Sequence, residues 1–225
     1  MDLKILSGGA MQGLMAEVVP LFERNSGYEV AVEIGLTSAL RKAIADGATF
    51  DIALLPRADV DALARDGRIA AGGVTDIARS AIGVAVRAGA RKPDIATVDA
   101  FKRAVLQAAS VTYSDGPSGL YVAGLMERLG LAEVIKSKTK LTTGPVAELL
   151  ARGDAELGLQ QIVAILPVKG ADLVGPLPAE LQNIIVYAAG LSAGSANAQA
   201  ARQFITFMAT PEVVGLIRAK GMEPG

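Results

Sequence analysis

Residues 3–27, LKILSGGAMQGLMAEVVPLFERNSG, contain the pattern that decides the fold. Residues 3–6 form a short, largely apolar run that predicts a strand, and a turn rich in glycine follows at residues 7–10. Across residues 11–22 the large apolar side chains recur every three or four positions, which predicts a helix with one buried face. Gly27 is well placed to end that helix in a left-handed conformation. The stretch is therefore a strand, a turn and a helix in succession.

Two further segments repeat this plan. Gly35-Leu36-Thr37-Ser38 joins a predicted strand at residues 29–34 to a helix, and residues 114–119, Ser-Asp-Gly-Pro-Ser-Gly, do the same after a strand at residues 111–114. Short apolar strands alternate with helical patterns along the whole chain. This alternation predicts an α/β fold with largely parallel strands.

Two long apolar strands, at residues 80–87 and 183–189, predict where the chain passes from one lobe to another. Lobe one is expected to comprise residues 1–79 together with residues 191–225. Lobe two is expected to be the continuous middle, residues 80–190, including both hinge strands.

The three turns share a chemistry that suits an anion. The first N–H groups of a helix have no partner inside the helix, and the helix dipole favours negative charge in front of them. Gly9 and Ala10 lie in the first turn, Thr37 and Ser38 in the second, and Ser118 and Gly119 in the third. The competing interpretation is that each hydroxyl only caps its own helix. Three such turns on one chain favour a shared anion site.

Composition excludes several classes of protein. The chain has neither Cys nor His, so thiolate nucleophiles, disulfides, Ser-His-Asp triads and the commonest metal ligands are absent. Acid–base chemistry by Asp, Glu, Lys or Tyr stays open. The 22 basic and 23 acidic residues nearly balance, which argues against a nucleic-acid-binding protein. We expect a binding protein, not an enzyme, with no metal, no cofactor and no nucleic-acid partner.

Four polar residues lie close to the predicted turns or strand ends. Gln160 and Gln161 follow an apolar strand, and their amides either donate to a ligand oxygen or face solvent and backbone. Asp51 and Asp115 resemble catalytic carboxylates by position. For Asp115 we expect its carboxylate to accept N–H groups of its own turn.

The whole chain resembles the type II periplasmic solute-binding proteins, and within them the molybdate-binding branch of ABC importers. The resemblance is carried by residues 22–30 (FERNSGYEV), 38–40 (SAL) and 46–52 (DGATFDI), and by residues 117–121 (PSGLY) and 153–158 (GDAELG). It closes on residues 200–204 (AARQF) and on Pro211-Glu212.

The resemblance implies two α/β lobes joined by two hinge strands, with a small anion held in a cleft between the lobes. Carried over by position, the ligand contacts fall on Ala10, Thr37, Ser38 and Ser118, on the backbone near Val146, and on Gln160 or Gln161. Ala10 stands where the family has a serine, and the glutamine stands where it has a tyrosine. The expected ligand is therefore a molybdate-like oxyanion or a small carboxylate.

The resemblance also implies a partner and a location. A solute-binding protein delivers its ligand to an ABC permease in the membrane, and we expect it to be a monomer. It is expected to be periplasmic if a leader was removed, and cytoplasmic otherwise. The alternative function is a stand-alone cytoplasmic ligand sensor of the same fold, similar to a regulator but without a DNA-binding domain.

Overall fold

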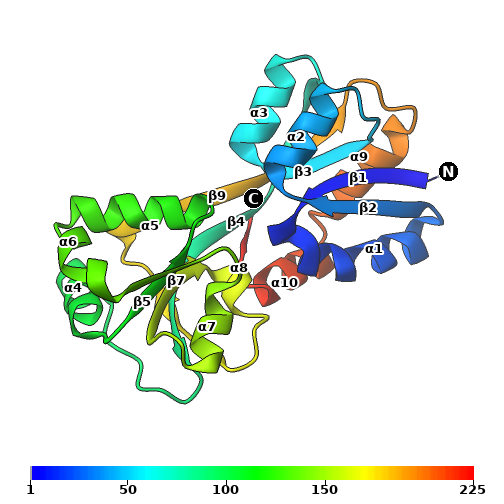
Figure 1. Ribbon diagram of the computed structural model, residues 1–225. Coiled ribbons are helices and arrows are strands. Elements are labelled where there is room, and N and C mark those ends of the chain that lie inside the picture. Colours follow the sequence, from blue (N-terminus) through cyan, green and yellow to red (C-terminus); the bar gives the residue numbers. More distant parts are fainter. Residues whose placement is uncertain (1) are drawn as a thin grey trace. The chain divides into compact units, whose positions relative to one another are not determined.

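The computed structural model describes residues 2–225, apart from the side chains of Asp2 and Pro117 (Figure 1). The chain divides into two compact units: unit 1 is Met1–Arg79 with Ile185–Gly225, and unit 2 is Ser80–Ile184. Helices and strands alternate in both units, so the predicted α/β class is confirmed. None of the described helices has both the length and the apolar character needed to cross a membrane.

Unit 1 is built on a sheet whose strand order is β2-β1-β3-β9-β4. Strand β1 runs parallel to β2 and β3, whereas β9 is antiparallel to β3 and β10 is antiparallel to β4. The elements are β1 (Asp2–Gly8), the 3-10 turn η1 (Gly9–Met11), α1 (Gln12–Ser26), β2 (Glu29–Gly35), α2 (Thr37–Ala45), β3 (Ile52–Pro56), α3 (Arg57–Arg65), the first part of β4 (Ile69–Arg87), β9 (Ile184–Ser192), α9 (Ala198–Phe207), α10 (Pro211–Ala219) and β10 (Glu223–Pro224).

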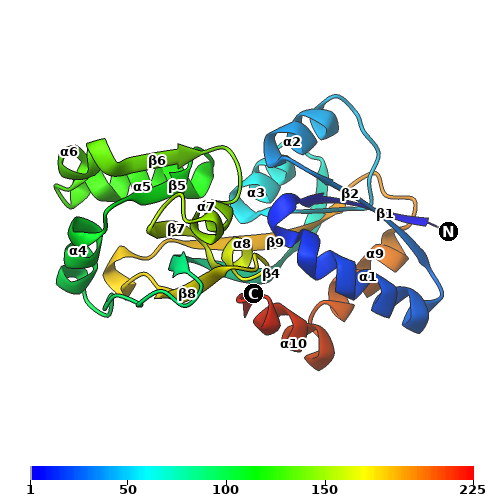
Figure 2. The same ribbon diagram turned by 60° about the horizontal axis from the view of Figure 1, so that its bottom comes forward.

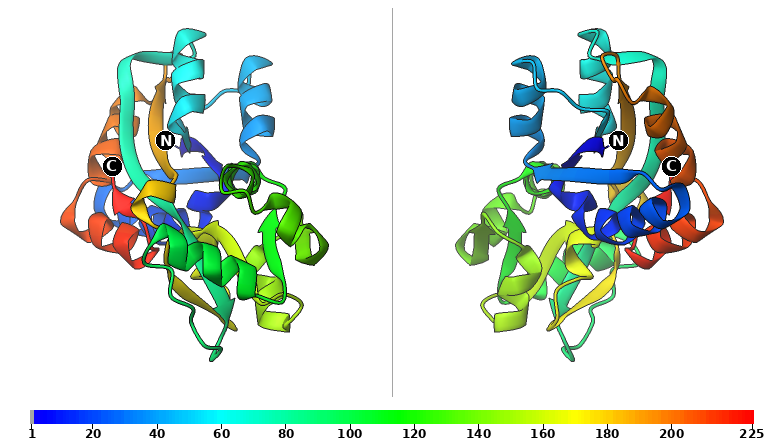
Figure 3. Two further views of the ribbon diagram at one scale, coloured as in Figure 1. Left: turned by 90° about the vertical axis from the view of Figure 1, so that its left-hand side faces the viewer. Right: turned by 90° about the vertical axis from the view of Figure 1, so that its right-hand side faces the viewer.

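Helices cover both faces of the unit 1 sheet. Helices α2 and α3 pack on one face through Leu40 and Leu63, which share a buried cluster with Leu6 of β1. On the other face lie α1, α9 and α10 (Figure 2). Phe22 of α1 meets Phe204 of α9 edge to face, with ring centroids 5.0 Å apart. Both views of Figure 3 show the red helix α10 beside the blue helix α1.

Unit 2 repeats this layered plan. The strand order is β4-β7-β5-β6, in which β5 is parallel to β6 and β7, and β4 is antiparallel to β7 and β8. Its elements are the second part of β4, α4 (Val98–Gln107), β5 (Val111–Ser114), α5 (Pro117–Arg128), α6 (Ala132–Ile135), the turn η2 (Lys136–Lys138), β6 (Thr139–Thr142), α7 (Val146–Arg152), β7 (Leu157–Gln161), α8 (Ile162–Ile165), β8 (Ala171–Pro176) and the turn η3 (Ala179–Leu181).

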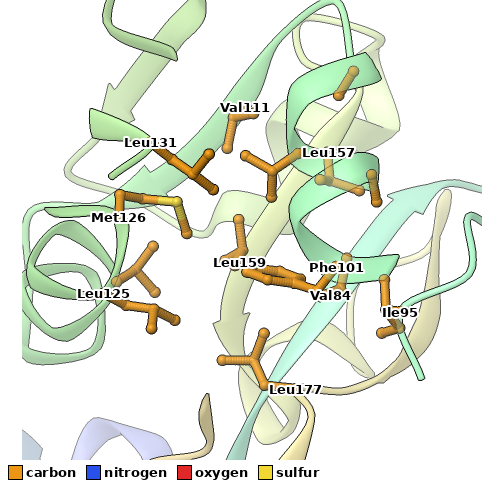
Figure 4. Packing of buried hydrophobic residues seen from close by; sticks show 14 of the residues in the cluster. Val84, Ile95, Phe101, Val111, Leu125, Met126, Leu131, Leu157, Leu159 and Leu177 are labelled. Carbon is orange, nitrogen blue, oxygen red and sulfur yellow. The ribbon is translucent and has the colours of Figure 1, made fainter. Parts of the chain in front are cut away.

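The main core of unit 2 lies between its sheet and helices α4, α5 and α6. Phe101 of α4 is fully buried there with Leu159 of β7, and Leu125 and Met126 of α5 pack beside them (Figure 4). A smaller cluster on the opposite face joins α7 and α8 to the sheet. The two faces are supplied by alternate residues of each strand, as the pleat requires.

Strand β4 is longer than the sequence predicts. We expected a strand over residues 80–87, whereas β4 begins at Ile69 and continues through Arg87. Gly72 lies within this early part with a φ of 66°, a conformation that breaks the regular pleat. Because Gly72-Gly73 normally signals a turn, the sequence pattern hides the first half of the strand.

Candidate functional site

The predicted turns of unit 1 lie side by side at one edge of its sheet. Strands β1 and β2 are parallel and their pairing ends with Gly8 opposite Gly35, so both turns follow the carboxyl ends of neighbouring strands. A Cβ atom added to Gly8 would lie 3.5 Å from Oγ1 of Thr37. The structure therefore places next to each other, in unit 1, the two turns that carry Gly9, Ala10, Thr37 and Ser38.

The helix N-termini at these turns are open. The residues preceding η1, α2 and α5 make no side-chain cap hydrogen bond, and the first turns of η1, α1, α2 and α5 contain no acidic residue. Helix α4 shows the usual alternative, because Oγ1 of Thr97 accepts from the N–H of Ala100 and Asp99 adds a negative charge. The hydroxyls of Thr37, Ser38 and Ser118 make no hydrogen bond to a described residue, so the first N–H groups of these helices stay available to an anion.

In unit 2 the third turn brings Ser118 and Gly119 to the N-terminus of α5. Both residues are buried, and Ser118 is 7% exposed. A Cβ atom on Gly119 would lie 1.5 Å from the carbonyl oxygen of Ser114, so only glycine allows the helix to start this close to the strand. Among the described residues, the Ser118 hydroxyl has no hydrogen-bond partner.

Val146 and Gln160 are joined directly. The backbone N–H of Val146, the first residue of α7, donates to Oε1 of Gln160 at 3.0 Å. Gly158, two residues earlier on the same face of β7, makes this approach possible, because a Cβ atom there would lie 2.7 Å from Cγ1 of Val146. The glutamine thus satisfies one N–H of α7, and its Nε2 donates to no described residue. Gln161 follows in the strand and points to the opposite face.

The two carboxylates that the sequence singled out have separate structural roles, and Asp51 lies directly before β3, not at one of the three turns. The buried Asp51 accepts hydrogen bonds from the N–H of Lys4 at 2.8 Å and from Oγ of Ser195 at 2.6 Å, so it fastens parts of unit 1 together. Asp115 is exposed and its N–H donates to the carbonyl of Thr142. Its carboxylate makes no hydrogen bond to any described residue, so the expected contact with its own turn is not formed.

Arg57, which follows β3, is held in ion pairs. Its Nε lies 2.8 Å from Oδ1 of Asp61 and its Nη1 lies 2.7 Å from Oδ1 of Asp76. The hydrogen bonds to Asp61 and then to Asp76 raise the pKa of Arg57 further above its ordinary value. The turns themselves therefore offer neutral donors, and their one titratable group is Asp115.

One feature of this site could not be predicted from the sequence, namely the hydrogen bond between Val146 and Gln160. The sequence places Val146 and Gln160 on separate elements and gives no signal that one would cap the other, because an amide at a strand end can bond many partners.

The comparisons with known proteins agree on the family. Residues 3–223 match the family described as bacterial extracellular solute-binding protein. An aconitate isomerase from Pseudomonas sp is 33% identical, over 99% of this chain and 87% of that protein. The substrate-binding domain assigned to a molybdenum ABC transporter of Clostridium difficile superposes with a TM-score of 0.85 at 15% identity, covering 99% of this chain and 98% of that chain. The periplasmic molybdate-binding protein of Azotobacter vinelandii gives 0.76 at 21% identity, covering 98% of each chain.

The named isomerase corrects one expectation. We expected that the chain is not an enzyme, and this is wrong, because a relative matching 99% of the chain is named for a catalytic activity. The lack of His and Cys removes two kinds of catalytic group but leaves carboxylates, which also transfer protons.

The resemblance to type II solute-binding proteins is confirmed. The family match spans nearly the whole chain, and the two solved structures cover almost all of it. This chain therefore belongs to the bacterial extracellular solute-binding proteins and has the fold of the type II periplasmic binding proteins.

Proposed function

We propose that this protein binds a small polycarboxylate anion at the open helix N-termini of its glycine-rich turns. The observation that carries the proposal is the set of open helix N-termini at η1, α2 and α5, where neither a cap nor an acidic first turn occupies the N–H groups. Hydroxyls of Thr37, Ser38 and Ser118 add donors without adding charge. Such donors suit carboxylate oxygens as well as inorganic oxyanions.

Two features favour a carboxylate over molybdate. Ala10 lacks the hydroxyl that the family resemblance implies at the first turn, and a glutamine, Gln160 or Gln161, takes the position of the implied tyrosine. The chain is also more similar in sequence to the aconitate isomerase, at 33% identity, than to the molybdate-binding protein, at 21%.

As a member of an extracellular solute-binding family, the protein would pass its ligand to an ABC permease outside the cytoplasm. Binding and transport need no chemistry at the ligand. The proposal therefore stands independently of any catalytic activity.

Calorimetric titration and thermal denaturation test the binding. The panel is cis-aconitate, trans-aconitate, citrate, sulfate and molybdate. A ligand present at a hundred times its dissociation constant stabilises the folded chain by about 2.7 kcal/mol, which gives a clear rise in the unfolding temperature. We expect the carboxylates to raise it more than the two inorganic anions. A rise with molybdate alone would contradict the proposal.

A second candidate function is isomerisation of such a ligand, and it is favoured by the name of the 33% identical relative. The two isomers of aconitate interconvert when a base removes a proton from the methylene carbon, the double bond moves by one carbon, and a proton returns to the other end. The reaction needs one proton acceptor and no oxidant. Asp115 is the carboxylate that the third turn provides, exposed and without a hydrogen-bond partner among the described residues.

The test follows the conversion of trans-aconitate by nuclear magnetic resonance in D₂O, where the shifted proton is replaced by deuterium. Asp115→Asn should abolish conversion while the chain still binds the ligand. Glu180→Gln, which changes an exposed carboxylate of unit 2 outside the turns, should leave the rate unchanged. If Asp115→Asn still converts trans-aconitate, Asp115 is not the base. If the unmodified chain does not convert it, the proposed isomerase activity is wrong.

A further inference from the structure

We infer that Ser114 is a further ligand-binding residue, whose hydroxyl donates to a carboxylate group bound at the N-terminus of α5. The inference rests on the proposed function and assigns part of that site to a residue outside the predicted contacts. Ser114 is the last residue of β5 and is 9% exposed. Its hydroxyl has no hydrogen-bond partner among the described residues.

The position of this hydroxyl points to the open helix terminus. A Cβ atom added to Gly116, the residue that precedes α5, would lie 3.6 Å from Oγ of Ser114. The hydroxyl therefore lies against the turn from which the first N–H groups of α5 extend. Helix α5 is 12 residues long, so its dipole is fully developed, and its first turn has no acidic residue.

A purely structural role does not account for Ser114. Its hydroxyl makes no hydrogen bond to a described residue, so it connects no two parts of the fold. Thr112 lies two residues earlier on the same face of β5, and its Oγ1 is fully buried without a partner. The Oγ of Ser114 is not fully buried in this way, and Ser114 ends the strand beside the turn, where a ligand can reach the hydroxyl.

Together, Ser114 and Ser118 provide two hydroxyls on either side of the turn that starts α5. A carboxylate has two oxygen atoms that each accept hydrogen bonds, so two hydroxyls and the helix N–H groups can satisfy it completely.

The test compares Ser114→Ala with Thr112→Val by calorimetric titration of cis-aconitate, trans-aconitate and citrate. Ser114→Ala should weaken binding by about tenfold or more. Thr112→Val removes the other unpaired hydroxyl of the same strand face and should leave the affinity unchanged. The unfolding temperature of unliganded Ser114→Ala should equal or exceed that of the unmodified chain, which a structural role would not allow.

The outcomes separate the two proposals. If the unmodified chain binds none of the three carboxylates, the proposed function fails and the inference fails with it. If the unmodified chain binds and Ser114→Ala binds equally well, only the inference is overturned. Equal losses in Ser114→Ala and Thr112→Val would also overturn it, because they would trace the loss to the strand and not to the hydroxyl at its end.

Discussion

The backbone N–H of Val146 donates to Oε1 of Gln160, 14 residues further along the chain, at 3.0 Å. The bond ties the start of α7 to the end of β7, and Val146 itself is fully buried. It gives the glutamine two tasks. The oxygen of the amide accepts from the N–H of the helix, and we propose that the nitrogen of the same amide donates to a ligand.

Replacing Gln160 by alanine and by glutamate separates these tasks. Gln160→Ala leaves the Val146 N–H without its acceptor, so unfolding in urea should show a loss of about 1–2 kcal/mol. Gln160→Glu keeps an acceptor for that N–H and should retain most of the stability. It also replaces the ligand donor by a negative charge, so anion binding should be lost. Retained binding in Gln160→Glu would show that the Gln160 side chain does not contact the ligand.

Substitution at Ser118 tests the third turn. Ser118→Glu places a carboxylate at the open N-terminus of α5, where it satisfies the N–H groups and repels an anion. Like charges in contact cost several kcal/mol, so binding should fall below detection in calorimetric titration. Lys136→Ala is the control, since the ion pair that this exposed lysine makes among the described residues is with Glu133, and it lies in η2, outside the three glycine-rich turns. The prediction is contradicted if Ser118→Glu binds like the control.

Much of the fold could be predicted from local pattern, because the chain repeats one unit of strand, turn and helix. The helix after residue 10, which we expected from apolar spacing, is α1 with Leu14, Met15, Val18 and Phe22 buried. Parallel pairing then places consecutive turns at one edge, which follows from the topology alone. The positions of the open helix N-termini in each unit could be predicted from the sequence for the same reason.

The features that could not be predicted from the sequence depend on contacts between residues that are distant along the chain. Strand β6 is an edge strand made of Thr139, Lys140, Leu141 and Thr142, so it lacks the apolar alternation that reveals a buried strand. The bond from Val146 to Gln160 and the unpaired state of Ser114 depend on how elements pack. A serine at a strand end looks the same in the sequence whether it caps a helix, faces water or binds a ligand.

Substitution of Lys138 tests how unit 2 stabilises the C-terminal end of helix α4. Its Nζ donates to three carbonyl oxygens at the end of that helix: Val105 at 3.0 Å, and Leu106 and Ala108 at 2.7 Å. Hydrogen bonds from a charged group to unsatisfied carbonyls stabilise a helix end. Lys138→Met should lower the free energy of unfolding by about 1–2 kcal/mol in urea titration. Lys169→Met, at an exposed position, should change it little. Equal effects of the two substitutions would contradict this role.

The last prediction concerns pH and follows from the neutral donors of the turns. Backbone N–H groups, hydroxyls and the Gln160 amide do not titrate between about pH 6 and pH 8. Burial, and then the charge of Glu127, raises the pKa of Tyr113 above its usual 10.0, and the ion pairs raise that of Arg57, so both groups keep their protons throughout this range. Affinity for trans-aconitate, corrected for its own titration, should therefore be nearly flat. Calorimetric titration at both ends of the range measures it. A change of about tenfold or more, or about 1.4 kcal/mol, would mean that binding is coupled to a titrating group. Binding by neutral donors alone would then be rejected.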